Sequence, residues 1–432
     1  MTAPFASIAD RIDRNALVRF VQSAFIFMFC TGLLLKTPWL PQTIFWLILL
    51  PAAGMFAYDS WLARRTLNSK NVRYWLIVGG LSVYFLTLIA STISFEGTIN
   101  ARIGEELWVA FACVVVAALG AELIRRDAAF ALKLARYLML SATVAGVILL
   151  VTASAEGPLG SFRLHGYPDI NYVLNPNAVG GVFAILFSLS LGHMLSRDRG
   201  RMELATTLAV AVLLITITFL TGSRSSMLAC LLAIGLVPFA LSPRLAIGVS
   251  GALVIAAAAI ALAFPDWLGS LLARGDSRRL DLWPVYFGMG LERPWTGYGL
   301  FFDQRIQIDG HTIYTPHNIL LAAFIHGGVG ACLALCLVLA AAALAALRAA
   351  RCGWWLPATT FAAMIGLGSV DHEVLASTFS YLWYLFYLPI GLCAGASLAP
   401  AGGGRKHLAG LVCETAPQSD GQNRKTPNKP TS

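Results

Sequence analysis

Long apolar segments separated by short polar stretches recur over the first 399 positions of the 432-residue chain. Most come close to the length of about 20 residues that an α-helix needs to cross the hydrocarbon core of a bilayer. They are continuous and do not alternate in period two, so a transmembrane β-barrel is excluded. The pattern predicts an all-α polytopic membrane protein with about 12 transmembrane helices, near residues 16–35, 41–58, 74–93, 105–123, 132–153, 176–196, 204–221, 225–241, 244–264, 316–347, 355–370 and 377–399.

Two connections between these segments are long, and both fall on the same side if the segments alternate across the membrane. They comprise residues 154–175 and 265–315. A connection of about 50 residues exceeds ordinary linker length and is usually functional, so we expect the working face on that side. Residues 276–292 should form an amphipathic helix along the membrane interface, with one apolar face made of Leu280, Trp283, Phe287 and Leu291.

The ends of the pattern give three further expectations. The first apolar segment is too long for the h-region of a signal peptide, so we expect a retained helix. The segment from residue 316 is long enough to tilt strongly or to protrude from the bilayer. Residues 1–399 should form a single transmembrane domain, and residues 400–432, rich in Gly, Pro and Lys, should be a disordered cytoplasmic tail.

Composition narrows the class of protein, and charge orients the chain. Apolar residues make up 57% and charged residues 12% of the sequence, with a mean hydropathy of +0.71, which excludes a soluble enzyme. With both termini in the cytoplasm, most basic residues fall on the inner side, as the positive-inside rule requires. The net charge of +9 therefore indicates orientation and not a nucleic-acid partner. The basic residues left outside are Lys36, Arg102, Arg163, Arg224, Arg274, Arg278, Arg279, Arg293 and Arg305.

The outer arginines are the first candidates for chemistry. Arg163 lies in the shorter loop, either as an anion ligand or as an interfacial snorkelling residue. Arg224 lies in the turn Thr221-Gly222-Ser223-Arg224-Ser225 between two very apolar segments. An arginine this close to the membrane is a functional candidate, and the flanking Gly and hydroxyls resemble an anion-binding helix N-terminus. The alternative for Arg224 is a salt bridge to an acidic residue of the large loop.

The large loop adds Arg274, Arg278 and Arg279, which are outnumbered by acidic residues, so some of these arginines should be paired internally. His317 and Asn318 follow where the next helix begins. A helix N-terminus disfavours imidazolium, so a neutral His317 could accept a proton. Its alternative is a helix cap, the role that we also assign to the Asn residues of Asn175-Pro176-Asn177.

Metal and cofactor sites find little support in the sequence. It lacks an HExxH or DxD motif, a P-loop and a dinucleotide-binding motif, and Asp371-His372-Glu373 falls in a tight turn where capping explains it equally well. We therefore expect no metal and no cofactor. An activated external donor would have to supply the energy for any reaction.

Three segments resemble the O-antigen ligase/polymerase superfamily of bacterial envelope glycosyltransferases. They are Leu220-Thr221-Gly222-Ser223-Arg224-Ser225, the pair Arg279 and Trp283 running on to Pro294, Gly297 and Gly299, and His317-Asn318 followed by Gly327-Gly328-Val329-Gly330. Within the superfamily the chain looks most like the ligase. The resemblance implies a membrane glycosyltransferase (GT-C-like) fold and an inverting, metal-independent transfer at the periplasmic face of the inner membrane. The donor would be O-antigen linked to undecaprenyl diphosphate, and the acceptor lipid A–core.

The resemblance also implies roles for individual residues. His317 would be catalytic, with Asn318 and Trp283 in support. Arg224 and Arg279 would be the leading diphosphate-binding residues, Arg163 a weaker candidate, and Arg274 or Arg278 could replace Arg279. An O-antigen polymerase or a protein O-oligosaccharyltransferase would use the same donor. A lipid-linked glycan transporter would instead require ionisable residues in mid-helix and paired broken helices.

Overall fold

The computed structural model describes residues 13–35, 37–62, 71–157, 163–164, 175–196, 200–240, 279–308, 311–370, 375 and 379–398, with isolated positions between 244 and 269. The predicted tail, Arg274, Arg278 and the Asp371-His372-Glu373 turn lie outside these residues, as does most of the predicted helix 244–264.

The described chain is a bundle of helices, which confirms the prediction of an all-α polytopic membrane protein. Eight helices in it are long and apolar enough to cross a membrane. They are α2 (Arg14–Leu34), Trp39–Asp59, α5 (Val72–Glu96), α6 (Ala101–Arg126), α7 (Phe130–Glu156), α8 (Pro176–Leu195), α9 (Arg201–Leu220) and α15 (Ile319–Arg351). The second span comprises α3 (Trp39–Ile44), a π-helical turn (Phe45–Leu49) and the start of α4 (Leu50–Leu62).

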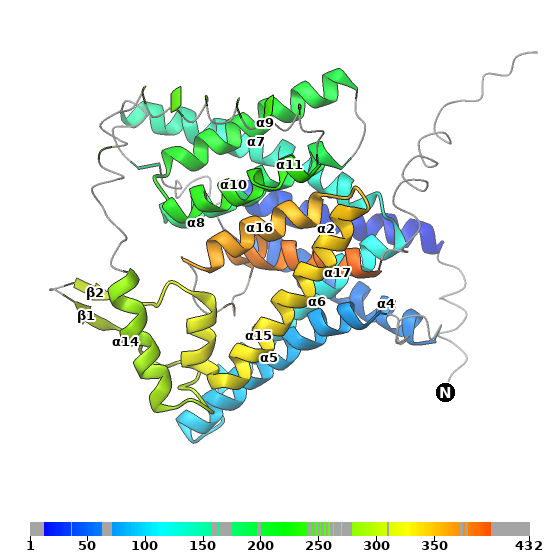
Figure 1. Cartoon of the computed structure of the whole chain (residues 1–432). Helices are drawn as coiled ribbons and strands as arrows, with labels where there is room; N and C mark the ends of the chain where they lie inside the picture. The colour runs from blue at the N-terminus through cyan, green and yellow to red at the C-terminus, as the bar shows by residue number, and fades with distance from the viewer. Residues whose placement is uncertain are drawn as a thin grey trace, which may run out of the picture.

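Shorter helices complete the bundle. They are α10 (Arg224–Ile234), α11 (Val237–Ala240), α16 (Leu356–Gly368), and a π-helical turn (Trp383–Tyr387) that leads into α17 (Leu388–Leu398). Figure 1 shows α7 to α11 above, α2, α16 and α17 in the middle, and α5, α6 and α15 below. Helix α8 is almost wholly buried because α7, α9, α10 and α16 surround it. Its glycines allow this, since a Cβ on Gly192 would lie 2.7 Å from the Cα of Leu356 in α16.

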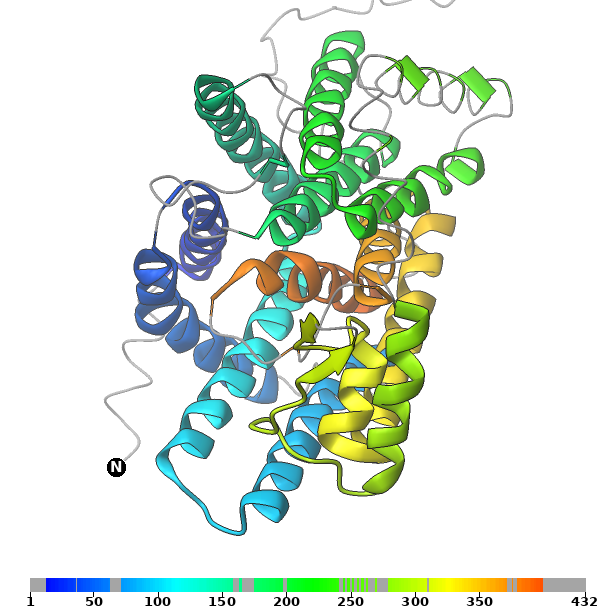
Figure 2. The same cartoon turned by 90° about the vertical axis from the view of Figure 1, so that its left-hand side faces the viewer.

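One end of the bundle carries a small subdomain outside the long helices (Figure 2). It comprises α14 (Arg279–Glu292) and a hairpin of β1 (Ile306–Ile308) and β2 (His311–Ile313). Its core is formed by Leu282 and Tyr286 of α14, with Tyr298 and Ile325. The prediction of a helix in this loop is confirmed. Its second buried face and the hairpin were not predicted.

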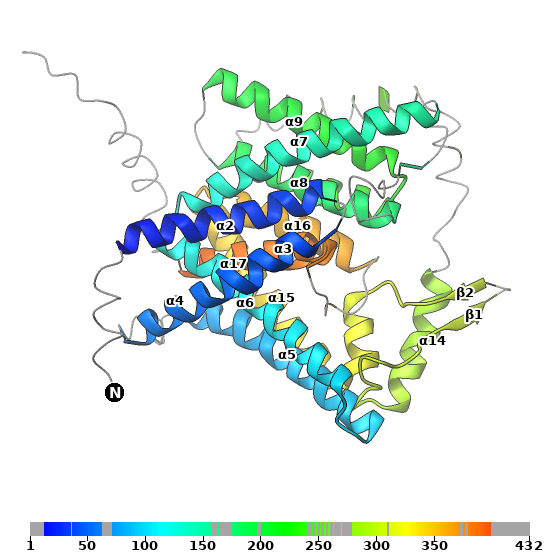
Figure 3. The same cartoon turned by 180° about the vertical axis from the view of Figure 1, so that it is seen from behind.

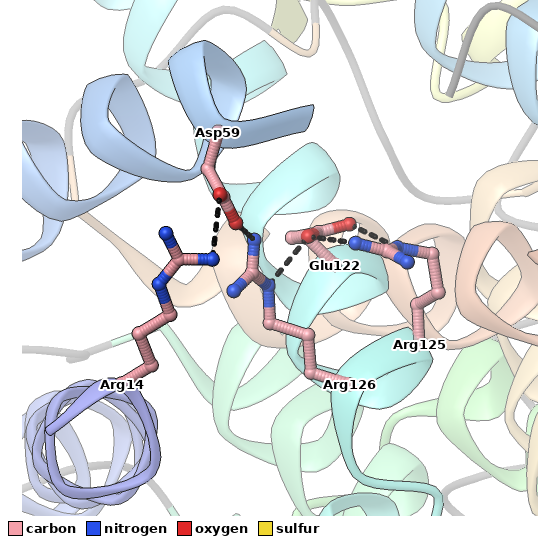
Figure 4. A network of polar contacts seen from close by, with 5 residues as sticks. All are labelled: Arg14, Asp59, Glu122, Arg125 and Arg126. Atoms are coloured by element: carbon pink, nitrogen blue, oxygen red, sulfur yellow. Dashed lines mark hydrogen bonds and ion pairs between the residues drawn. The ribbon is translucent and has the colours of Figure 1, made fainter. Parts of the chain in front are cut away.

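The opposite end of the bundle is held by a network of ion pairs between α2, α4 and α6 (Figure 4). Glu122 accepts from Arg126 Nε at 2.6 Å and from Arg125, and Arg126 Nη2 reaches Asp59 at 2.9 Å. Arg14 lies 3.5 Å from the same Asp59 carboxylate. Figure 3 shows the three helices from the other side of the molecule. The network fixes the ends of helices that come from distant parts of the chain.

Candidate functional site

The turn before α10 places Arg224 at a helix N-terminus, as the sequence predicted. Ser223 caps the helix by accepting from the Ser226 amide, and Gly222 adopts the left-handed φ of 61° that the turn needs. The Ser223 hydroxyl also lies 3.0 Å from that of Ser225 and 2.8 Å from that of Ser226. Arg224 is half-buried beside this cluster of hydroxyls.

Arg163 is tied to this turn through its side chain and its neighbour. Its Nε donates to the carbonyl of Thr221 at 2.9 Å, and its Nη2 donates to Asn177 Oδ1 at 2.8 Å. The amide of Leu164 donates to the carbonyl of Leu220. These bonds join the first loop to the ends of both α8 and α9. Asn175 caps α8, as predicted.

His317 and Asn318 divide the start of α15 between them. Asn318 is the cap, because its Oδ1 accepts from the amides of Leu320 and Leu321, each at 3.0 Å. His317 precedes the cap with a φ of 51°, and among the described residues it alone has a positive φ without being glycine. Such a conformation is uncommon and concentrates at functional sites. The His317 ring extends toward Thr315, whose Oγ1 lies 3.3 Å from Nδ1.

Helix α14 brings two predicted site residues to His317. Trp283 donates from Nε1 to the carbonyl of Pro316 at 3.1 Å, which holds the segment that carries the histidine. Burial lowers the pKa of His317 below its ordinary value, and the positive charge of Arg279 lowers the pKa further. Arg279 is therefore close enough to His317 for their charges to interact, and both effects favour the neutral form of the imidazole.

The C-terminal end of α16 contacts both α10 and α15. A Cβ on Gly366 would lie 2.9 Å from the Cα of Ala229 in α10, and one on Gly368 would lie 2.8 Å from Ile319 of α15. Asn318 Nδ2 donates to the carbonyl of Ser369 at 3.0 Å. Helix α10, which begins at Arg224, and helix α15, which begins just after His317, therefore both pack on this end of α16.

An apolar cavity of about 900 Å³ lies between α14 and the first half of α15, and Asn318, the residue after His317, lines it. It begins at Asn318 and Trp283 and continues along α15 to Leu333. Phe287 of α14 and Leu333 are more than half exposed, so the cavity is open along its side. The lining residues are Trp283, Pro284, Phe287, Asn318, Leu320, Leu321, Phe324, Val329, Cys332 and Leu333.

Several contributors to this region were missed in the sequence. Thr315 and the carbonyl of Ser369 belong to no recognisable sequence motif. The residues around His317 likewise do not indicate its positive φ. The apolar face of α14 was predicted as a membrane contact, yet Trp283 and Phe287 line the cavity. Within the described part of the chain, no group of three or more His, Cys, Asp or Glu side chains is placed to hold a metal ion.

Comparison with known proteins agrees with this arrangement of residues. Residues 209–336 match the family model described as O-Antigen ligase, and no curated protein matches the chain. The matched segment includes Arg224, Arg279 and His317 together with the cavity. This segment is therefore similar to the O-antigen ligase/polymerase superfamily of glycosyltransferase-like enzymes, and the eight candidate spans support a multi-pass membrane protein.

Proposed function

We propose that the chain is an O-antigen ligase of the bacterial inner membrane. It transfers polysaccharide from undecaprenyl diphosphate to a sugar hydroxyl of lipid A–core at the periplasmic face, with inversion. One observation carries the proposal: the positive charge of Arg279 acts on His317, and an apolar cavity begins at the next residue, Asn318. The proposed transfer needs a base for the acceptor hydroxyl, a cation for the diphosphate and an apolar cavity for the lipid chain.

In this proposal His317 is the general base. The acceptor hydroxyl attacks the anomeric carbon of the donor sugar and passes its proton to the neutral imidazole. The bond from that carbon to the diphosphate oxygen breaks, and undecaprenyl diphosphate leaves with the electron pair. The lowered pKa of His317 supports this role, because a protonated imidazole could not accept the proton.

The arginines stabilise the leaving diphosphate. A guanidinium offers a bidentate fork to phosphate oxygens, and its effect is largest in a partly dry site. Arg279 and Arg224 are the leading residues for this role, and Arg274 and Arg278 remain candidates from the sequence. Arg163 also remains a candidate, but its bonds to Thr221 and Asn177 favour a part in holding the Arg224 turn.

The cavity accommodates the polyprenyl chain of the donor. It extends from Asn318 to Leu333, past the glycines at which α15 is broken. A lipid chain in it would run from the diphosphate at Arg279 toward the interior of the membrane. The cavity's open side allows the chain to enter laterally from the bilayer.

The distribution of charge supports an orientation with both termini in the cytoplasm. Described basic residues of the connections assigned to the inside lie at the end of the bundle away from α14. They include Arg125 and Arg126 at the end of α6 and Arg348 and Arg351 at the end of α15. By the positive-inside rule, α14 and the site then face the periplasm.

The proposal is tested by complementing a deletion of the gene in the source bacterium and separating its lipopolysaccharide on a gel. Wild type should restore O-chains on the core, whereas His317→Ala and Arg224→Lys at equal expression should not, since a lysine cannot reproduce the guanidinium fork. Arg305→Lys is the matched control for Arg224→Lys, because Arg305 is an exposed arginine of the large loop that is paired with Asp303.

Each alternative gives a different gel. Core capped with single repeat units in the deletion strain would indicate a polymerase. An unchanged ladder would indicate protein glycosylation or transport. Normal O-chains with His317→Ala would remove this residue from the mechanism. Accumulation of full-length donor at the outer face, probed in the same deletion cells, would support the ligase over a flippase.

A further inference from the structure

Helix α15 is broken where its two consecutive glycines occur. Gly328 has φ 63° and ψ −163°, far from helical values, although the chain continues as helix on both sides. The break interrupts the hydrogen bonds between successive turns and leaves backbone groups that need other partners. In a membrane protein such groups must find partners within the protein.

Residues 293–300, which follow directly on α14, supply these partners. The amides of Tyr298 and Gly299 donate to the carbonyls of Ile325 and His326 at 2.9 and 2.8 Å. In the opposite direction, the amide of Val329 donates to the carbonyl of Pro294 at 2.7 Å. The loop therefore takes the place of the missing turn of α15. We call this arrangement the interlock.

Glycines on both sides permit the two backbones to approach this closely. A Cβ on Gly297 would lie 2.6 Å from the amide nitrogen of Gly327, and a Cβ on Gly328 would lie 2.6 Å from the backbone of Trp295. Both glycines also have positive φ angles near 63°. Two of the segments that carried the family resemblance, Pro294–Gly299 and Gly327–Gly330, thus meet in one structure.

The side chain of His326 closes the interlock. It is 2% exposed, and its Nδ1 lies 2.6 Å from the carbonyl of Gly299. A carbonyl oxygen only accepts, so Nδ1 carries the proton and donates. Nε2 is then an acceptor, buried and without a hydrogen-bond partner among the described residues. An unpaired buried acceptor is unfavourable, so packing alone does not explain a histidine here.

Broken helices in transporters expose backbone groups to the transported ligand. In this chain the groups at the break are occupied by the protein's own loop. The break therefore joins α15 to residues 293–300. The backbone groups that form these hydrogen bonds are not left open to coordinate an ion.

We propose that His326 is a positioning residue, which through the interlock sets α14 against the start of α15 and so sets Arg279 relative to His317. Residues 294–299 are continuous with the C-terminus of α14, and the bond from Tyr298 to Glu292 at 2.6 Å fixes their junction. Loosening the interlock lets α14 shift along α15. This inference rests on the proposed function for its effect on catalysis.

The test compares two substitutions of His326 in the full-length protein in nanodiscs. His326→Asn retains a donor one bond beyond Cγ, where Nδ1 stands, whereas His326→Leu removes it. Hydrogen exchange of the peptide spanning 293–300 should become about tenfold faster in His326→Leu and stay near wild type in His326→Asn, because exchange reports local opening. Transfer should fall about 100-fold in kcat for the leucine variant, the scale of a misplacement near 1 Å.

A pair of glycine variants provides the control for the loop. Gly297→Ala introduces a clash with α15 and a strained φ, and should act like His326→Leu. Gly288→Ala lies in α14, where a Cβ meets nothing within 4 Å, and should leave exchange and transfer unchanged.

Unchanged exchange and transfer in His326→Leu would overturn the proposal, and so would faster exchange with a normal kcat. Equal loss of kcat in both histidine variants would also overturn it, since the donor would then not matter. If the wild type transfers no glycan, the proposed function fails. The exchange comparison would still decide whether His326 closes the interlock.

Discussion

Asn318 joins two helices, α15 and α16, so the effect of its replacement can be worked out in parts. Its Oδ1 caps α15 through two amides, and its Nδ2 donates to the carbonyl that ends α16. Losing an N-cap costs about 1 kcal/mol of stability, and losing one ordinary hydrogen bond costs about 1 kcal/mol more. We therefore expect Asn318→Ala to lower the free energy of unfolding by about 2 kcal/mol.

A serine at this position separates the two contributions. Serine is nearly as good a cap as asparagine, but its hydroxyl cannot cap α15 and also reach Ser369. Asn318→Ser should therefore lose about 1 kcal/mol, the bond to α16 alone. Since Asn318 follows His317 directly, both variants should also lower kcat, with the alanine variant the lower of the two.

The measurement is reversible unfolding by sodium dodecyl sulfate in mixed micelles, followed by circular dichroism, with kcat measured on the same preparations. A stability of Asn318→Ala within 0.5 kcal/mol of wild type, the range of ordinary surface substitutions, would refute the assignment of these bonds. Equal stability of the serine and alanine variants would show that the cap contributes nothing.

Three further predictions concern neighbouring contacts. Arg279→Gln removes the positive charge that lowers the pKa of His317, so the acidic limb of the pH profile of kcat/KM should move to higher pH; an unmoved limb would separate the two residues. Trp283→Phe keeps an aromatic ring but loses the N–H that donates to the carbonyl of Pro316. It should lower the free energy of unfolding by about 1 kcal/mol and lower kcat, as measured by the same unfolding and transfer assays. Glu122→Gln weakens the pair with Arg126; the side chains are 12% and 16% exposed, between the surface and buried cases, so a loss of about 2 kcal/mol in stability with kcat unchanged is expected. A fall in kcat with unchanged stability in that last variant would contradict a purely structural role for the network.

The membrane spans were predictable because a spanning helix must satisfy its backbone internally and present an apolar surface along its whole length. The apolar character therefore extends along the whole of each segment, and the described helices begin and end close to the predicted limits. Asn175 was predicted as a cap for a comparable reason, since the residue type and its position before Pro176 carry the information locally.

The interlock was not predictable by the same reasoning. Glycines are frequent in transmembrane helices, so Gly327 and Gly328 alone do not indicate a break. The residues that fill the break lie in another loop, and their pairing depends on the tertiary structure. Sequence reasoning also missed the inner face of α14, because Leu282 and Tyr286 alternate with the apolar residues that line the cavity.

The site residues show the same division between local and distant information. The residue types and their order along the chain pointed to Arg279 and His317. Their electrostatic contact and the strained φ of His317 required the structure. The sequence predicted that Arg163 either binds an anion or lies at the membrane interface. In the structure its side chain donates to Thr221 and Asn177.

The break in α15 also bears on the depth at which the proposed reaction would take place. The part of the helix from residue 329 to residue 351 extends about 35 Å at 1.5 Å per residue, which exceeds the hydrocarbon thickness of about 30 Å. This part is long enough to cross the bilayer by itself, so the residues before the break lie toward one membrane surface. In the proposed orientation they form a post at the level of the lipid headgroups, with His317 at its top. The hydrated sugar chains can then react in water while the lipid part of the donor stays in the membrane.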